Sequence, residues 1–360
     1  MVETPRVRRQ GAKWKARPVR GRREAPVYRF IVGTGRCGST LLSKMIRENE
    51  QVASIFEHFN GLDGSRRFSR EPIDGPAFTE MLCAVHPFLN MVLSRGYPVP
   101  EVTYPLDDPQ RRFDRSSGVP WTLGTTIPEL GVADPDAFYD ELRAFTLALP
   151  PRPAAEQHRA LFEWMTKKIG RSVWVERAGA AIDYMGELGA IFPQARFLHI
   201  HRAGEEAALS MREHHAYRLA IMLSNRLPAG TGRSQAELDA YARSQERTDE
   251  ISQLIDSRPA PEYFGRWWNE QVLRGFRALR RLDAEQYREI RFEDLIERPA
   301  AVLQEVAEFL ELPDPRGAWR QRAAALVRSV PPARAPALSD AERQALEEAC
   351  RPGNFLLGRL

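Results

Sequence analysis

The stretch YRFIVGTGRCGSTLL, residues 28–42, joins a short apolar run, a glycine-rich turn and the opening of a helical segment. Phe30–Val32 predict a buried strand, Gly33–Gly38 a tight turn, and the residues from Ser39 onward a helix. In that order, the N–H groups of the turn and the positive end of the helix dipole face the same point, where they favour an anion. The stretch therefore predicts a phosphate-binding loop.

The loop differs at one position from the loops of ATP- and GTP-hydrolysing proteins. Gly33 and Gly38 have the spacing of G-x-x-x-x-G-K-[ST], but Ser39 stands where that motif has lysine. Hydrolysing enzymes use this lysine on the β- and γ-phosphates, so its loss argues against that chemistry. A cation lies inside the turn instead, as Arg36. A P-loop kinase is therefore the less favoured interpretation of the loop.

The same residues resemble the 5′-phosphosulfate loop of the sulfotransferase family, whose donor is 3′-phosphoadenosine 5′-phosphosulfate (PAPS). The family pattern, P-[KR]-[ST]-G-[ST]-T, has its cation where Arg36 stands and its hydroxyls where Ser39 and Thr40 stand. Arginine at this position is similar to the tyrosylprotein, trehalose and bacterial small-molecule branches. The resemblance implies that PAPS contacts the loop residues Gly35, Arg36, Cys37, Gly38, Ser39 and Thr40.

Two later strand-like segments extend the resemblance. Residues 194–202 predict a buried strand that ends in a cation, Arg202, and Ser210 lies two turns into the helix that follows. The resemblance implies that Arg202 and Ser210 bind the 3′-phosphate of the donor through a forked charged pair and a hydroxyl. Val173–Arg177 predicts another strand, and Arg177 resembles the cation that follows this strand in the family.

The C-terminal part of the chain carries weaker similarity. Residues 287–299 resemble the family ending R-Y-E-D-L…P, and Arg328–Val330 faintly resembles the adenine-side segment, which places Ser329 at the donor. The similar segments, residues 28–60, 172–212 and 287–312, cover 100 of the 360 positions. The resemblance therefore specifies the donor half of a site and leaves the acceptor half open.

Glu57 is the candidate general base that takes the proton of the acceptor. It follows a short apolar segment, Val52–Phe56, and lies 21 residues after Arg36, the separation at which the tyrosylprotein and trehalose branches place their catalytic glutamate. Arg36 is the candidate cation for the departing phosphate, and its charge predicts an ionised Glu57 at neutral pH. The neighbouring His58 is the rival candidate for the same proton.

Alternation of strand and helix predicts an α/β fold, a P-loop-like parallel sheet flanked by helices. The expected strands lie at 28–33, 51–56, 172–176, 195–201 and 287–292, and the expected helices at 39–48, 182–191, 203–218 and 300–310. We expect one domain over residues 26–360, in which helical insertions at 60–170 and 213–285 form the acceptor pocket. Within these insertions, Asp134-Pro135 predicts a helix start.

Charge and composition indicate which partners and which cellular compartment to expect. Nine Arg and Lys residues fall in the first 23 positions, although the formal net charge of the chain is only +4. We therefore expect residues 1–25 to form a basic disordered tail and the remainder to bind no nucleic acid. No long apolar run is present and no apolar segment follows the basic residues, which predicts a cytoplasmic protein without a membrane partner. The three cysteines are widely spaced and the histidines lack metal-ligand spacing, so we expect no metal.

The expected activity is metal-independent transfer of a sulfuryl group from PAPS to a hydroxyl of a small molecule, such as a metabolite or natural product. Two alternatives remain open: a sulfotransferase-fold protein that binds the nucleotide without turnover, and a lyase that uses sulfonation to create a leaving group. The long insertions contain aromatic residues, which predicts a partly apolar acceptor pocket. The sequence does not identify the acceptor.

Overall fold

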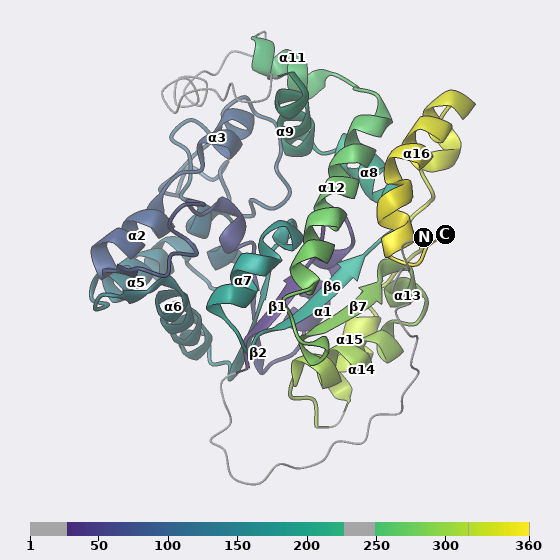
Figure 1. Cartoon of the computed structure of the whole chain (residues 1–360). Helices are drawn as coiled ribbons and strands as arrows, with labels where there is room; N and C mark the ends of the chain where they lie inside the picture. Colours follow the sequence, from purple (N-terminus) through teal and green to yellow (C-terminus); the bar gives the residue numbers. More distant parts are fainter. Residues whose placement is uncertain (1–26, 227–248, 316, 360) are drawn as a thin grey trace.

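The computed structural model describes residues 27–226, 249–315 and 317–359. Its centre is a five-stranded sheet in the order β2-β5-β1-β6-β7, and every neighbouring pair of strands is parallel (Figure 1). The strands are β1 (Arg29–Val32), β2 (Val52–Phe56), β5 (Val173–Arg177), β6 (Arg196–His201) and β7 (Tyr287–Arg291). The predicted α/β class and the five predicted strands are confirmed.

Each face of the sheet is covered, which explains why almost every residue of the central strands β5, β1 and β6 is buried. Successive residues of a strand point to opposite faces. Phe30 and Val32 of β1 therefore join one core cluster, whereas Ile31 joins the other. The four residues of β1 are all buried. This buried strand is what holds the glycine-rich turn in a fixed position.

Different sets of helices cover the two faces of the sheet. The cluster around Ile31 is built with α1 (Ser39–Arg47), α14 (Pro299–Leu310) and α15 (Ala318–Ala324), and the cluster around Phe30 with α6 (Ala154–Lys168) and α7 (Met185–Ile191). A third cluster joins α8 (Gly204–Arg212), α12 (Pro261–Leu279) and α16 (Asp340–Leu356). Outside the insertion between β2 and β5, the other described helices are α9 (His215–Arg226), α11 (Glu250–Asp256) and α13 (Phe292–Glu297).

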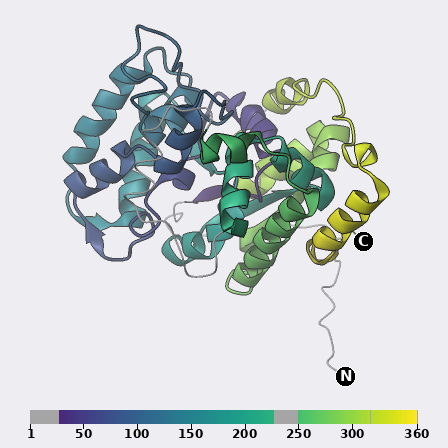
Figure 2. The same cartoon turned by 90° about the horizontal axis from the view of Figure 1, so that it is seen from above.

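The insertion between β2 and β5 forms a helical lobe beside the sheet, seen at one side of the molecule in Figure 2. It contains α2 (Gly75–Cys83), α3 (Pro87–Leu93), α4 (Ile127–Glu129), α5 (Pro135–Leu147) and a ribbon of β3 (Pro72–Ile73) with β4 (Arg152–Pro153). As predicted, Asp134 caps α5 and its carboxylate accepts the N–H of Asp136 at 3.1 Å. Short turns complete the described elements: η1 (Phe59–Gly61), η2 (Thr122–Thr126), η3 (Ala181–Tyr184), η4 (Ala284–Gln286) and η5 (Ala335–Ala337).

One predicted helix is divided. The expected helix over 203–218 ends at Arg212, and α9 begins at His215. The side chain of His214 turns back at the break, where its Nδ1 accepts the N–H of Tyr217 at 3.5 Å. The break releases His214 from the helix pattern and lets its ring face the neighbouring cavity.

Two expectations fall on residues outside the described ranges. The basic tail, residues 1–25, lies there, as do residues 227–248 of the expected helical insertion 213–285. Among the described helices, none combines the length and the apolar character needed to cross a bilayer.

Candidate active site

A cavity of about 580 Å³ opens at the carboxyl ends of β1, β2, β5 and β6, the edge at which open parallel sheets bind ligands. The loop after β1, the residue after β2 and the end of β5 all contribute to its lining. Residues that are far apart in the sequence meet there: Gly35, Arg36, Gly38, Ser39, Thr40, Glu57, Asn60, Glu101, Trp121, Arg177, Arg202, Ser210, His214, Tyr217, Ser329 and Arg334.

The glycine-rich turn has a left-handed backbone at three positions, with φ of 76° at Gly35, 52° at Arg36 and 94° at Gly38. A side chain at either glycine would also collide with a neighbour. A Cβ atom at Gly38 would lie 2.1 Å from the ring of Phe292, and one at Gly35 would lie 1.8 Å from Tyr217 Oη. The turn therefore depends on both glycines, while Arg36 is held in a conformation that non-glycine residues rarely adopt.

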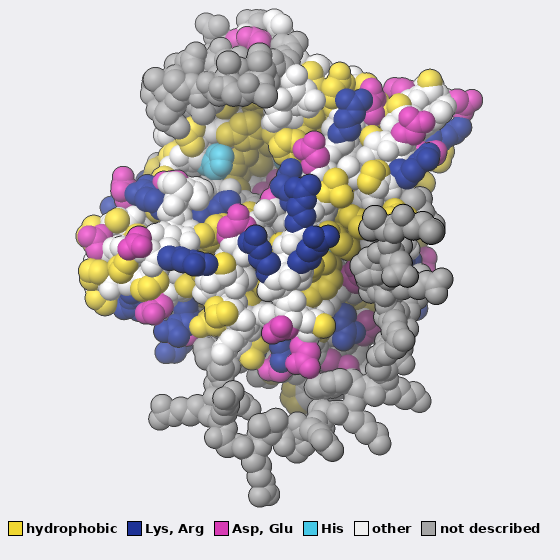
Figure 3. All heavy atoms as spheres, viewed as in Figure 1, with side chains coloured by type: hydrophobic (Ala, Val, Ile, Leu, Met, Phe, Trp, Pro, Cys, Tyr) yellow, Lys and Arg dark blue, Asp and Glu magenta, His cyan; other side chains and the backbone are white. Residues whose placement is uncertain are grey.

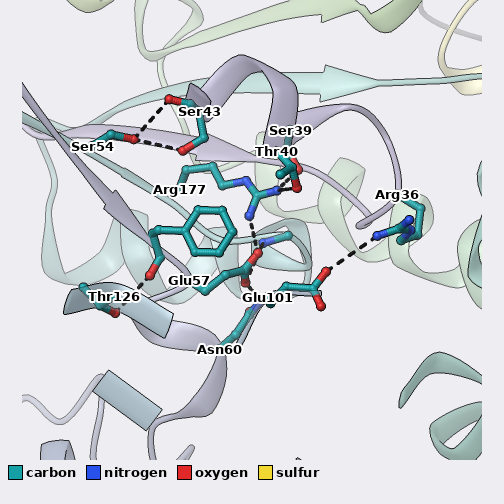
Figure 4. Close-up of polar contacts among 12 residues, drawn as sticks. Arg36, Ser39, Thr40, Ser43, Ser54, Glu57, Asn60, Glu101, Thr126 and Arg177 are labelled. Atoms are coloured by element: carbon teal, nitrogen blue, oxygen red, sulfur yellow. Dashed lines mark hydrogen bonds and ion pairs between the residues drawn. The ribbon is translucent and has the colours of Figure 1, made fainter. Parts of the chain in front are cut away.

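Glu57 and Arg177 form a buried ion pair at the cavity wall, with each side chain 3% exposed. Arg177 Nη1 donates to Glu57 Oε1, and the N–H of Gly179 donates to both carboxylate oxygens at 3.0 Å (Figure 4). Asn60 also donates to this carboxylate. Glu57 itself has a left-handed backbone, with φ of 54°, directly after β2. This turn directs its side chain back toward the end of β5.

The ion partner expected for Glu57 is corrected by the structure. Arg177, not Arg36, lies against the Glu57 carboxylate, because Arg36 Nη1 faces Glu101 at 3.6 Å. Burial raises the pKa of Glu57, although the charge of Arg177 and the N–H of Gly179 act in the opposite direction. The negative charge of Glu101 raises this pKa further.

Arg177 joins the base to the phosphate loop. Its Nη2 donates to Ser39 Oγ at 2.7 Å and to Thr40 Oγ1. The same guanidinium lies over the ring of Phe56, 4.6 Å from the centroid. Because the loop hydroxyls and the Glu57 carboxylate share this one cation, an anion at the loop would lie close to the base.

Arg202 and Ser210 lie at the other end of the cavity, together with residues from the C-terminal segment. Arg202 follows β6, pairs with Glu206 at 3.2 Å and lies over the ring of Phe292. Ser210 Oγ accepts from Arg36 Nε at 3.3 Å. Ser329 lines the same cavity. The structure thus brings these sequence-predicted donor residues into one cavity.

Two predicted site residues are not brought to the cavity wall. Cys37 is buried in the core beneath the turn, so its side chain is structural. His58 is fully buried and its Nε2 lies 3.0 Å from His158 Nδ1. Burial lowers the pKa of His58 well below its usual range. The reason is its position, because Glu57 turns into the cavity and the next residue points into the aromatic core.

Sequence reasoning missed Glu101, Asn60 and Tyr217. Glu101 lies in the irregular segment between α3 and η2, where no motif or periodicity marks it. No sequence motif marks Asn60 or Tyr217 either. Asn60 is identified by its contact with Glu57, and Tyr217 by its contact with the glycine-rich turn. His214, by contrast, could be suspected from its place beside the predicted acceptor side.

A second groove, of about 460 Å³, lies between α7 and α12. Figure 3 shows Lys and Arg side chains gathered over these helices on the face in view. In this groove, Asp183 pairs with Arg274 at 2.8 Å. The groove contains no part of the glycine-rich turn, so the candidate chemistry lies in the larger cavity. Within residues 27–226, 249–315 and 317–359, no three His, Cys, Asp or Glu side chains are grouped to hold a metal ion.

Comparison with known proteins gives matches to solved structures alone. No protein-family model matches the chain, and no curated protein does. The chain is similar to a sulfotransferase domain from the curacin biosynthetic pathway, with 12% identity, 93% of this chain and 99% of that chain covered, and a TM-score of 0.44. It is similar to a sulfotransferase from Mycobacterium avium, with 16% identity, 92% and 78% coverage, and a TM-score of 0.45. A sulfotransferase from Alicyclobacillus acidocaldarius gives 14% identity, 93% and 97% coverage, and a TM-score of 0.39. Because these values are low, the proposed function rests on the residues of the cavity.

Proposed function

We propose that this protein is an enzyme that transfers the sulfuryl group of PAPS to a hydroxyl of a small-molecule acceptor. One observation carries the proposal: the anion-binding turn, the cation-plus-hydroxyl pair Arg202 and Ser210, and the buried carboxylate Glu57 all line one cavity. These are the parts that sulfuryl transfer requires, namely two phosphate sites and a base.

The donor end of the cavity is basic. The N–H groups of residues 35–40 and the N-terminus of α1 would hold the 5′-phosphosulfate. Arg202 and Ser210 would hold the 3′-phosphate, and Ser329, which lines the same cavity, would contact the adenosine portion. PAPS would supply an activated sulfuryl group to this site.

The acceptor end is mostly apolar. Phe88, Leu89, Val99 and Trp121 line it around the Glu57 carboxylate. An apolar wall with a few fixed polar groups suits a metabolite or natural-product hydroxyl. Glu57 would accept the hydroxyl proton as the acceptor oxygen bonds to sulfur, while Arg177 and Arg36 neutralise the oxygens of the departing phosphate.

The experiment is incubation of the protein with PAPS and a panel of primary alcohols and phenols. We expect acceptor-dependent release of adenosine 3′,5′-bisphosphate and a gain of SO₃ in the acceptor mass. Loss of water from the acceptor would indicate the lyase, and binding of PAPS without release would indicate a nucleotide-binding protein. Either result would overturn the proposal.

Arg202 is expected to discriminate the 3′-phosphate. Its side chain is 10% exposed beside Ser210 and Phe292, and a hydrogen bond to a charged group contributes about 1.5–3 kcal/mol. Arg202→Ala should therefore weaken binding of adenosine 3′,5′-bisphosphate about 10- to 100-fold, and binding of AMP much less. Titration calorimetry with both nucleotides measures the ratio. Equal losses for the two nucleotides would remove Arg202 from the 3′-phosphate site.

The pH dependence of turnover should show an acid limb set by Glu57. Because burial raises the pKa of Glu57 above its ordinary value of 4.5, the carboxylate is ionised at high pH and becomes protonated as pH falls through the raised pKa. Activity should be full above that pKa and lost below it. A kcat profile at saturating PAPS measures the limb. An acid limb at or below the ordinary glutamate range would contradict this assignment.

A further inference from the structure

Glu101 brings a second carboxylate into the cavity. It belongs to the irregular segment between α3 and η2 and lies between Glu57 and Arg36, at the junction of the donor and acceptor ends (Figure 4). Its side chain is 19% exposed. A carboxylate beside an anion-binding loop is electrostatically unfavourable for an anionic donor, so its presence needs an explanation.

His214 anchors this carboxylate. His214 Nδ1 accepts the N–H of Tyr217 at 3.5 Å, which leaves the proton on Nε2, and Nε2 donates to Glu101 Oε2 at 2.9 Å. Burial alone would raise the pKa of Glu101, but the hydrogen bond from His214 and the charge of Arg36 outweigh it and lower the pKa to about 2. The Glu101 carboxylate therefore stays ionised at neutral pH.

Arg36 is held from two sides. Its Nε donates to Ser210 Oγ at 3.3 Å, and its Nη1 faces Glu101 Oε1 at 3.6 Å. The backbone of Arg36 is set by its left-handed conformation in the turn. The backbone of Arg36 and two nitrogens of its guanidinium are therefore held in place. The contact with Glu101 orients the remaining N–H donors of Arg36 toward the junction of the donor and acceptor ends of the cavity.

We propose that Glu101 is a positioning residue, which holds the Arg36 guanidinium at the point where the sulfuryl group passes from donor to acceptor. This inference rests on the proposed function. Without the Glu101 charge, Arg36 is free to turn toward the phosphates. Donor binding is then kept or strengthened, but the cation is misplaced for the transfer step, where misplacement of a group by about 1 Å can lower a rate about 10²-fold.

The charge of Glu101 also acts on Glu57, which gives the test a readout that a purely structural role would not move. Glu101 is one of the groups that raise the pKa of Glu57. The titratable groups coupled electrostatically to Glu57 are Arg177 and Glu176 from β5, Glu101 from the irregular segment, Tyr184 from η3 and Tyr217 from α9. Removal of the Glu101 charge should shift the acid limb of the kcat profile to lower pH.

Glu101→Gln tests the proposal, since the amide oxygen still accepts from His214 while the charge that holds Arg36 is lost. With the alcohol or phenol that wild-type protein turns over fastest, we expect kcat to fall about 10- to 100-fold. The Kd for adenosine 3′,5′-bisphosphate should stay unchanged or fall, and the acid limb should move to lower pH. Glu213→Gln is the matched control, because Glu213 is exposed, pairs with Arg258 at 3.7 Å and lies outside the cavity.

An unchanged kcat and acid limb in Glu101→Gln, with normal wild-type turnover, would overturn the positioning role and leave the proposed function standing. A loss of donor affinity that matches the loss of kcat would overturn it as well. If Glu101→Gln does not fold, His214→Asn removes the anchor and keeps the charge, so kcat should fall without a shift of the acid limb; an unchanged kcat would refute the proposal. Absence of turnover in the wild-type protein would refute the proposed function itself.

Discussion

Glu57→Gln is expected to reduce kcat by about 10²–10⁴-fold, the usual contribution of a positioned general base. Glutamine has the shape of glutamate and can still accept the N–H of Gly179, but it cannot take a proton from the acceptor. Binding of adenosine 3′,5′-bisphosphate should change little, because residues other than Glu57 would bind the phosphate groups of the donor. The measurements are kcat at saturating PAPS and nucleotide affinity by calorimetry.

The variant also leaves the buried Arg177 cation without its anion, and breaking a buried ion pair costs about 3–5 kcal/mol. The melting temperature of the variant should therefore fall, and its kinetics should be measured well below that temperature. Glu129→Gln is the matched control, since it removes a carboxylate from a 2.6 Å pair with Arg47 outside the cavity. Near-normal turnover of Glu57→Gln, together with loss of turnover in His58→Ala, would give the base role to His58.

Arg36→Gln is expected to lower kcat by about 10²–10³-fold, the scale on which removal of one preorganised donor to a developing charge acts. Arg36 lies in the turn at the junction of the two cavity ends, so its charge should matter most while the phosphate departs. Arg36→Lys keeps the charge but loses the planar fork and should recover part of the rate. The KM for PAPS and kcat separate a role of Arg36 in donor binding from a role in the transfer step.

Arg47→Gln is the control for this variant, because Arg47 ends α1, the helix that follows the turn, and pairs with Glu129 away from the cavity. A rise in KM for PAPS with an unchanged kcat would show that Arg36 contributes to ground-state binding alone. That result would remove Arg36 from the transfer step.

Most of the sheet could be predicted from sequence because apolar residues make up at least half of β1, β2, β5 and β6, and a charged or glycine residue ends or follows each of these strands. The turn after β1 and Arg202 after β6 could be placed for the same reason, since the carboxyl ends of parallel strands share one edge. Helix 203–218 was predicted as continuous because no proline or glycine marks the break at His214. At the break, His214 contacts Glu101, a tertiary contact that the local sequence does not reveal.

The electrostatic pairing in the site could not be predicted for a related reason. Arg36 and Arg177 are both plausible partners of Glu57 in the sequence, and the choice depends on where the left-handed turn at Glu57 directs its carboxylate. The choice between Glu57 and His58 is similar, because one residue of register decides which side chain enters the cavity. Glu101 could not be anticipated, since it reaches the cavity from an irregular segment.

The central claim, transfer of a sulfuryl group by this cavity, is tested most directly with PAPS labelled in its sulfuryl group and the same panel of alcohols and phenols. We expect the label to appear in an acceptor sulfate ester with wild-type protein, one label for each adenosine 3′,5′-bisphosphate released, and to be lost in Glu57→Gln. Adenosine 3′,5′-bisphosphate released without labelled ester, or labelled ester formed equally by Glu57→Gln, would contradict the account.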